Sequence, residues 1–100
     1  MTERDYAGAV DLWRRVVVLT PSRASNQLRL ADALVAANRL DEAAKNYQAA
    51  ISLGAAVDAH RRLADVYDAL GRQEESARER ATYVSRQFDD LQQRSSGDLR

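Results

Sequence analysis

The sequence predicts an all-α protein of five helices that is built from repeated helical hairpins, and three observations support this prediction. Helix formers dominate, because 18 of the 100 residues are alanine and the chain holds one proline and four glycines. One pattern of apolar residues recurs with a period of about 34 residues. Within each copy the apolar residues are spaced so that they share one face of a helix.

Five helices are expected, joined by links of about three or four residues that make neighbouring helices antiparallel. They span residues 4–19, 24–37, 41–53, 57–70 and 74–94. The first ends before Pro21, because proline disfavours a helical conformation in the residue that precedes it. Ser22 or Ser25 is suited to cap the second helix, and Asp41 to cap the third. Residues 95–100 are expected to form a flexible tail.

Two shifts of the sequence against itself define the repeat. The first superposes the first expected helix on the third and places Ala9, Trp13, Val16 and Val17 on Ala43, Tyr47, Ala50 and Ile51. A slightly shorter shift superposes the second helix on the fourth and places Leu30-Ala31-Asp32 on Leu63-Ala64-Asp65. The unit is therefore a helical hairpin of about 34 residues.

These residues resemble the tetratricopeptide repeat (TPR), whose pattern is W-x2-L-G-x2-Y, then A-x3-F, then P. The complete unit reads Gln27-x2-Leu30-Ala31-x2-Leu34 and then Ala43-x3-Tyr47, and the next unit reads His60-x2-Leu63-Ala64-x2-Tyr67. The resemblance implies one superhelical solenoid array over residues 4–94. Its parts are the second helix of a partial repeat (4–23), a complete repeat (24–56) and a last repeat with an extended capping helix (57–94).

The sequence departs from the family pattern in informative places. Gln27 and His60 replace the leading aromatic residue, and Arg80 stands where the second helix of the last repeat should carry one. A second apolar stripe follows in the last helix, with steps of four and three residues: Ala77, Ala81, Val84, Phe88 and Leu91. We interpret this helix as a C-terminal cap, and the alternative is a dimerisation helix.

Composition argues against several classes of function. Fifteen basic and fifteen acidic residues give no net charge, whereas a nucleic-acid interface needs a positive excess. No cysteine and one histidine leave no metal site, and no apolar run approaches the roughly 20 residues of a membrane span. His60 lies beside Arg61 and Arg62 and is interpreted as a surface or packing residue. We expect no catalytic residue, metal, cofactor or nucleic-acid partner, and hence no enzyme.

The resemblance implies that the first helix of each hairpin lines a concave groove where peptides dock. The groove residues expected here are Ser25, Leu28, Asp32 and Val35, followed by Asp58, Arg61, Asp65 and Asp68. The acidic second set predicts a partner that presents basic or amide groups, and it disfavours a clamp for a peptide carboxylate. An ordinary solvated surface is the alternative.

The first helix also suggests a weak homodimer. Its apolar side carries Tyr6, Val10, Trp13 and Val17, and in a complete repeat a preceding helix would cover part of that side. The alternative is a monomer that tolerates an exposed patch.

The sequence thus predicts a non-catalytic protein-interaction scaffold that binds a peptide or protein in its groove. The alternative is a structural capping or homo-oligomerisation segment of a larger protein whose activity lies elsewhere. Fourteen arginines against one lysine, together with the alanine content, are typical of high-GC bacterial genomes. The cytoplasm is slightly favoured as the location, and an export signal would lie outside this chain.

Overall fold

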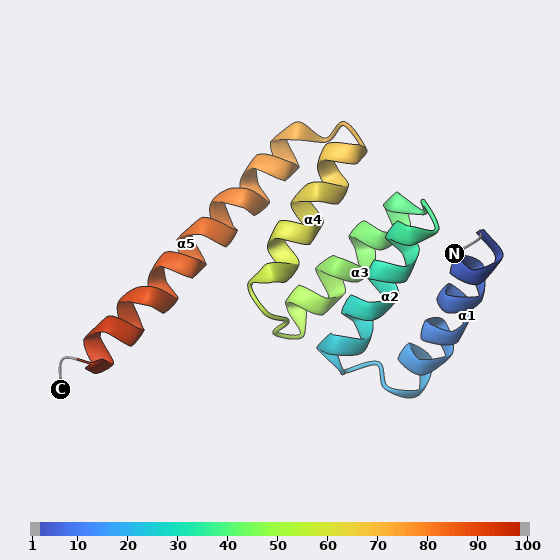
Figure 1. Ribbon diagram of the computed structural model, residues 1–100, viewed down its shortest axis with the longest axis horizontal. Coiled ribbons are helices and arrows are strands. Elements are labelled where there is room, and N and C mark those ends of the chain that lie inside the picture. The colour runs from blue at the N-terminus through green and yellow to red at the C-terminus, as the bar shows by residue number, and fades with distance from the viewer. Residues whose placement is uncertain (1–2, 99–100) are drawn as a thin grey trace.

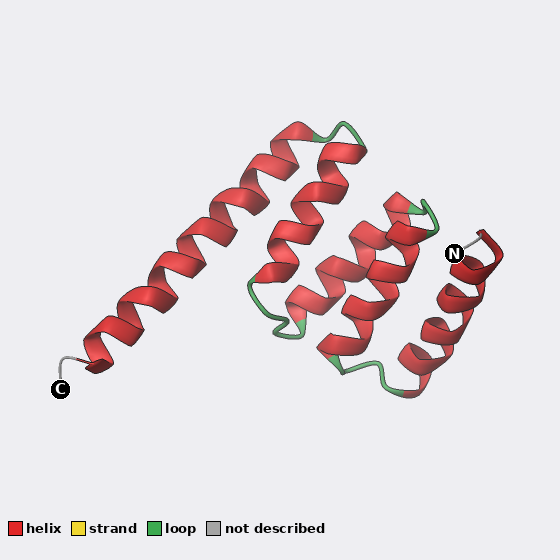
Figure 2. Cartoon of the chain, viewed as in Figure 1, coloured by secondary structure: helices red, strands yellow, loops and turns green. Residues whose placement is uncertain are grey.

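The computed structural model describes residues 3–98, and within them the chain forms five α-helices and no strand (Figures 1 and 2). The helices are α1 (Glu3–Leu19), α2 (Ala24–Ala36), α3 (Leu40–Ser52), α4 (Asp58–Ala69) and α5 (Gln73–Asp98). The predicted all-α, five-helix fold is confirmed.

Each helix packs against its neighbours in the chain, so α1 contacts α2, α2 contacts α3, α3 contacts α4 and α4 contacts α5. The result is an elongated array of 52 × 32 × 23 Å in which α2/α3 and α4/α5 form successive hairpins (Figure 1). The C-terminal part of α5 extends beyond α4. Such stacking of neighbours is the architecture of a solenoid.

The core contains the apolar positions of the repeat. Leu30, Leu34, Tyr47, Leu63 and Tyr67 are all buried, as the repeat pattern predicts. Six of the thirteen buried hydrophobic residues are alanines, and these small side chains let neighbouring helices approach closely.

The turns inside the two hairpins are equivalent. Asn38 and Gly71, which occupy the same place in successive repeats, both adopt a left-handed conformation, with φ of 59° and 74°. In each turn the next amide reaches back to a buried helix residue: Arg39 N donates to Leu34 O and Arg72 N donates to Tyr67 O, both at 2.8 Å. This hydrogen bond satisfies a carbonyl at the end of the helix.

The predicted helix caps are wrong. The N-cap positions of α2 and α3 are occupied by Arg23 and Arg39, and neither makes a side-chain cap hydrogen bond. The turn at Asn38 leads directly into α3, which begins at Leu40, so Asp41 lies within the first turn of the helix. There its negative charge still favours the helix N-terminus.

Two arginine–glutamate pairs mark the starts of the second helices. Arg39 Nε donates to Glu42 Oε1 at 3.0 Å, and Arg72 Nε donates to Glu75 Oε1 at 2.7 Å. The two pairs occupy equivalent positions in successive hairpins and so belong to the repeat.

The last helix is longer than expected: α5 continues to Asp98, four residues past its expected end at Arg94. Glutamine and arginine before the tail favour a helix, and no proline follows to end it. Residues 99 and 100 lie outside the described part of the chain.

Candidate functional site

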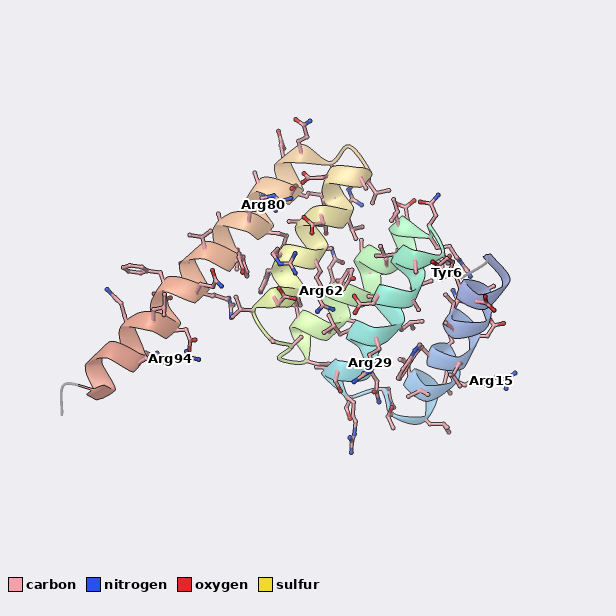
Figure 3. All side chains as sticks on the ribbon, viewed as in Figure 1. Tyr6, Arg15, Arg29, Arg62, Arg80 and Arg94 are labelled. Carbon is pink, nitrogen blue, oxygen red and sulfur yellow. The ribbon has the colours of Figure 1, made fainter. Side chains whose placement is uncertain are left out.

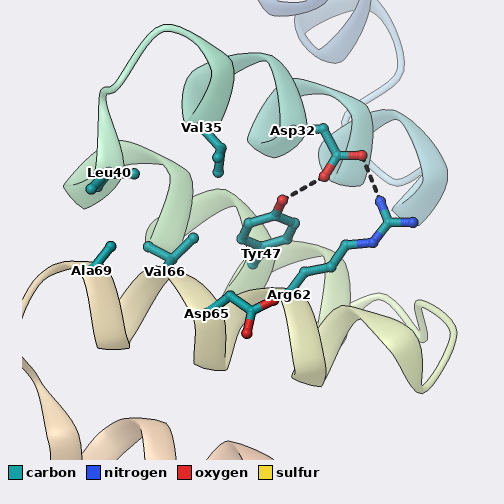
Figure 4. Close-up of a pocket in the computed structure, with 8 residues that line it drawn as sticks. All are labelled: Asp32, Val35, Leu40, Tyr47, Arg62, Asp65, Val66 and Ala69. Atoms are coloured by element: carbon teal, nitrogen blue, oxygen red, sulfur yellow. Dashed lines mark hydrogen bonds and ion pairs between the residues drawn. The ribbon is translucent and has the colours of Figure 1, made fainter.

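A pocket of about 280 Å³ opens between α2 and α4, with α3 at its base (Figure 4). We call it the α2–α4 groove, and its lining residues are Asp32, Val35, Leu40, Tyr47, Arg62, Asp65, Val66 and Ala69. Apolar side chains gather at one end and charged side chains at the other. Tyr47 and Val66 are buried, whereas Val35 and Ala69 remain exposed. This arrangement suits one apolar side chain beside polar groups.

A hydrogen-bonded network joins three helices at the charged end. Tyr47 of α3 donates its hydroxyl to Asp32 Oδ1 of α2, and Arg62 Nη1 of α4 donates to Asp32 Oδ2 at 2.6 Å. Arg62 Nε also donates to Asp58 Oδ2 at 2.7 Å. Burial, and next the hydrogen bond to Asp32, raise the pKa of Tyr47 far above its ordinary value. Tyr47 therefore remains a protonated donor.

A second cluster of ion pairs joins α4 to α5. Arg80, which is labelled in Figure 3, donates from Nη2 to Asp65 Oδ1 at 2.9 Å and also to Asp68. Arg61 Nε donates to Asp58 Oδ1 at 2.9 Å, and Arg61 Nη1 lies 3.5 Å from Asp65 Oδ2. The hydrogen bond from Arg61, with a further one from Arg62, lowers the pKa of Asp58.

These pairs correct the expected acidity of the groove. We expected an acidic face, but Asp32, Asp58, Asp65 and Asp68 are each paired with an arginine of this chain. Arg80 occupies the position in the last repeat that Tyr47 occupies in the preceding one. At that position Tyr47 of α3 reaches Asp32, and Arg80 of α5 reaches Asp65 in the same way. Four carboxylates against three guanidinium groups leave an excess of one negative charge in this region.

The structure divides the eight expected groove residues. Asp32, Val35 and Asp65 line the pocket, and Asp58, Arg61 and Asp68 belong to the adjoining ion pairs. Ser25 is exposed and does not line the pocket. Leu28 does not line the pocket, and its side chain packs against the hydrophobic core instead.

Sequence reasoning missed five residues that line the pocket: Leu40, Tyr47, Arg62, Val66 and Ala69. Arg62 had a detectable signal, because it follows Asp58 by four residues and the two therefore share a helix face. Tyr47 was assigned to the core, Leu40 lay in an expected link, and Val66 and Ala69 were given no role; the contribution of all four depends on how α2 and α4 pack.

The expected self-association face on α1 is largely covered. Val10 is fully buried and Val17 packs against the core, because α2 lies over this side of α1. Trp13 is partly buried, and the Arg29 guanidinium carbon lies 5.5 Å from the centre of its ring. Tyr6 is also partly buried. The exposed large apolar residues of α1 are Leu12, Val18 and Leu19 instead.

Polar pairs replace the leading aromatic residue in both hairpins. Asn46 Nδ2 donates to Gln27 Oε1 at 2.9 Å, and His60 Nδ1 lies 2.6 Å from Glu79 Oε2. The two pairs occupy equivalent positions of successive repeats, and His60 is 7% exposed. Of the two roles that we considered for His60, surface or packing, its burial favours packing.

Among the described side chains, those of residues 5–94, no three of histidine, aspartate or glutamate lie together as ligands for a metal ion. Between residues 3 and 98, no helix combines the length and the apolar character that crossing a membrane requires.

Comparisons with known proteins agree with the repeat geometry. The family model described as tetratricopeptide repeat matches residues 1–51 and 28–84. A structure of MamA AMB-1 is similar, with a TM-score of 0.76 and 29% identity, over 82% of this chain and 45% of the MamA chain. MamA MSR-1 is also similar, with a TM-score of 0.76 and 28% identity, over 91% and 50%. The chain thus spans about half the length of these structures. No curated protein matches it.

Proposed function

The chain belongs to the tetratricopeptide repeat family, and we propose that it is a non-catalytic scaffold that binds a peptide or protein partner in the α2–α4 groove. Repeats of this family form protein-interaction surfaces, and the helical array seen here provides such a surface.

The observation that carries the proposal is the division of the groove into an apolar end and a charged end (Figure 4). Val35, Ala69 and the buried Val66 offer contact to an apolar side chain. Asp32 and Asp65 lie beside it, and their side chains are 43% and 53% exposed although both are paired. A carboxylate accepts several hydrogen bonds, so both can receive further ones from a ligand.

We infer that the partner is a peptide segment with one aliphatic side chain next to amide or basic groups. The single excess negative charge around the groove favours neutral or positive groups over a carboxylate. Because the arginines balance most of this charge, salt should weaken binding only modestly.

Selection of peptides from a displayed random library against the whole chain tests the proposal. Ala69→Arg places a long charged side chain at the apolar end of the groove, and Ala69 is exposed, so the fold should tolerate it. Ala56→Arg makes the same change at an exposed position that does not line the pocket and serves as the control. We expect the selected peptides to bind Ala69→Arg at least about tenfold more weakly, a loss of about 1.4 kcal/mol, and to bind Ala56→Arg as well as the wild type. Equal binding to both variants would contradict the proposal.

A further inference from the structure

The charged end of the α2–α4 groove presents a hydrogen-bond donor and an acceptor side by side. Arg62 Nη1 of α4 donates to Asp32 Oδ2 of α2 at 2.6 Å, and both residues line the pocket (Figure 4). The side chains of Arg62 and Asp32 are 36% and 43% exposed, so a ligand in the groove can reach them. The ion pair therefore offers carboxylate oxygens and guanidinium N–H groups at one place.

Neither member of this pair uses its full hydrogen-bonding capacity within the chain. Arg62 has five guanidinium N–H groups and donates one to Asp32 and one to Asp58, and the others have no partner among the described residues. Asp32 accepts one hydrogen bond at each oxygen, from Tyr47 and from Arg62, so each oxygen keeps a second lone pair. The bonds to Tyr47 and Asp58 hold the two groups in place, which reduces the entropy cost of binding a ligand there.

We propose that the Asp32–Arg62 pair binds the side-chain carboxamide of an asparagine or glutamine in the partner peptide. The carboxamide N–H donates to Asp32, and the carboxamide oxygen accepts from Arg62. This inference rests on the proposed function, because it assigns one ligand group to the same groove, and it narrows the amide or basic groups of the partner to a primary carboxamide.

The geometry of a primary carboxamide matches the ion pair. One of its N–H groups lies on the same side as its carbonyl oxygen, so that it presents a donor and an acceptor next to each other. A main-chain peptide bond is almost always trans, and its N–H and C=O therefore point in opposite directions. Such a bond cannot contact both members of an ion pair whose atoms are 2.6 Å apart. The pair thus distinguishes an asparagine or glutamine side chain from the main chain that every peptide contains.

The charges around the groove also favour a neutral group. Asp32 is paired with Arg62, and Asp65 lies 2.9 Å from Arg80 Nη2 and 3.5 Å from Arg61 Nη1. A lysine or arginine of the partner would therefore lie close to guanidinium groups as well as to carboxylates. A glutamate or aspartate of the partner would lie close to both carboxylates of the pocket. A carboxamide avoids both repulsions and still bonds to both members of the pair.

Peptides selected from a displayed random library against the whole chain test the proposal. Those that lose binding to Ala69→Arg occupy the groove, because Ala69 lines its apolar end. Among these peptides we expect asparagine or glutamine at a fixed position relative to the aliphatic residue. A charged residue at that position, or no enrichment at any position, would overturn the carboxamide proposal and leave the groove as the binding site. If no selected peptide is sensitive to Ala69→Arg, the proposed function and this inference are both contradicted.

The affinity of one such peptide for the wild type gives a second measurement. Replacing its glutamine by methionine, or its asparagine by leucine, keeps the size of the side chain and removes the donor and the acceptor. This replacement should weaken binding about tenfold, as expected for hydrogen bonds to charged groups. Replacement by lysine or glutamate should weaken binding at least as much. Equal or tighter binding of the lysine peptide would overturn the proposal.

A double-mutant cycle tests whether Arg62 contacts the carboxamide. Arg62→Met removes the guanidinium group, and Arg86→Met makes the same change at an exposed position of α5 that does not line the pocket. The apolar replacement in the peptide should weaken binding about tenfold to Arg86→Met but at most about threefold to Arg62→Met. A purely structural role of Arg62 would lower the affinity for both peptides equally, so an unchanged tenfold ratio in Arg62→Met would overturn the proposal. If Arg62→Met does not fold, the peptide series on the wild type decides.

Discussion

Arg80 of α5 donates a hydrogen bond to Asp65 of α4 at the position where, one repeat earlier, Tyr47 of α3 donates to Asp32 of α2. Both pairs are separated by 15 residues, so the contact between hairpin helices recurs inside the chain while its chemistry changes. The last repeat therefore fixes α5 through surface ion pairs, where the preceding repeat uses a buried tyrosine.

Charge reversal at Arg80 tests this contact. Arg80→Glu places a carboxylate beside Asp65 and Asp68, so we expect a small loss of stability, because the three side chains are about half exposed. The loss should shrink as salt is raised, since salt screens exposed charges. Urea unfolding at low and high salt measures both effects. Arg80→Gln serves as the uncharged control, and a loss independent of salt would contradict an electrostatic role.

Truncation of the core tests the repeat packing. Leu63 is fully buried at the leucine position of the last repeat, so Leu63→Ala should lower the free energy of unfolding by about 2–5 kcal/mol. Leu53 is 41% exposed, and Leu53→Ala should cost much less. Urea denaturation of both variants makes the comparison, and similar losses would be inconsistent with the assigned core.

Ionisation of tyrosine tests the network at the groove. Since the pKa of Tyr47 is raised by burial and by Asp32, Tyr47 should remain protonated at pH 11 in the folded chain. Tyr47→Phe should therefore give the same tyrosinate absorbance at pH 11 as the wild type, provided that circular dichroism shows both to be folded. A clear decrease in the variant would show that Tyr47 ionises normally.

Acid should remove the contribution of Asp58 to stability. Its pKa in the folded chain is lower than the value near 4 of an unfolded aspartate, so the carboxylate stabilises the fold above about pH 4. That stabilisation is lost as the pH falls from there through the folded pKa. Asp58→Asn should thus be less stable than the wild type at pH 7, with a difference that narrows towards pH 3. The effect is small, because the Asp58 side chain is 39% exposed.

Urea unfolding at the two pH values measures the effect of Asp58, with Asp89→Asn, an exposed position on α5, as the control for loss of one charge. If the free energies of unfolding of the wild type and Asp58→Asn differ by the same amount at both pH values, the assigned ion pairs are contradicted.

Repeat spacing was sufficient to predict the helices and the core. The position of a residue in the helical hairpin determines whether its side chain packs inward. For this reason the burial of Leu30, Leu63, Tyr47 and Tyr67 was predictable. The side chains between hairpins were less predictable. Val10 is covered by α2, and Arg80 reaches Asp65. Both contacts depend on the distance and angle between two helices, and the spacing of residues within one helix does not determine them.

The groove shows the same limit. Asp32, Val35 and Asp65 were identified because they share the groove-facing side of their helices, and all three line the pocket. Arg62 and Tyr47 complete it through hydrogen bonds that join three helices, and one-dimensional spacing does not contain that information.

An amide NMR titration of the whole chain with a selected peptide shows whether the α2–α4 groove is the binding site. If the α2–α4 groove is the binding site, the largest shifts will map to its lining residues on α2 and α4, around Val35 and Ala69, and Ala69→Arg will abolish them at the same peptide concentration. If the largest shifts map instead to α1 or to Val84–Leu91 of α5, or persist in Ala69→Arg, the groove is not the binding site.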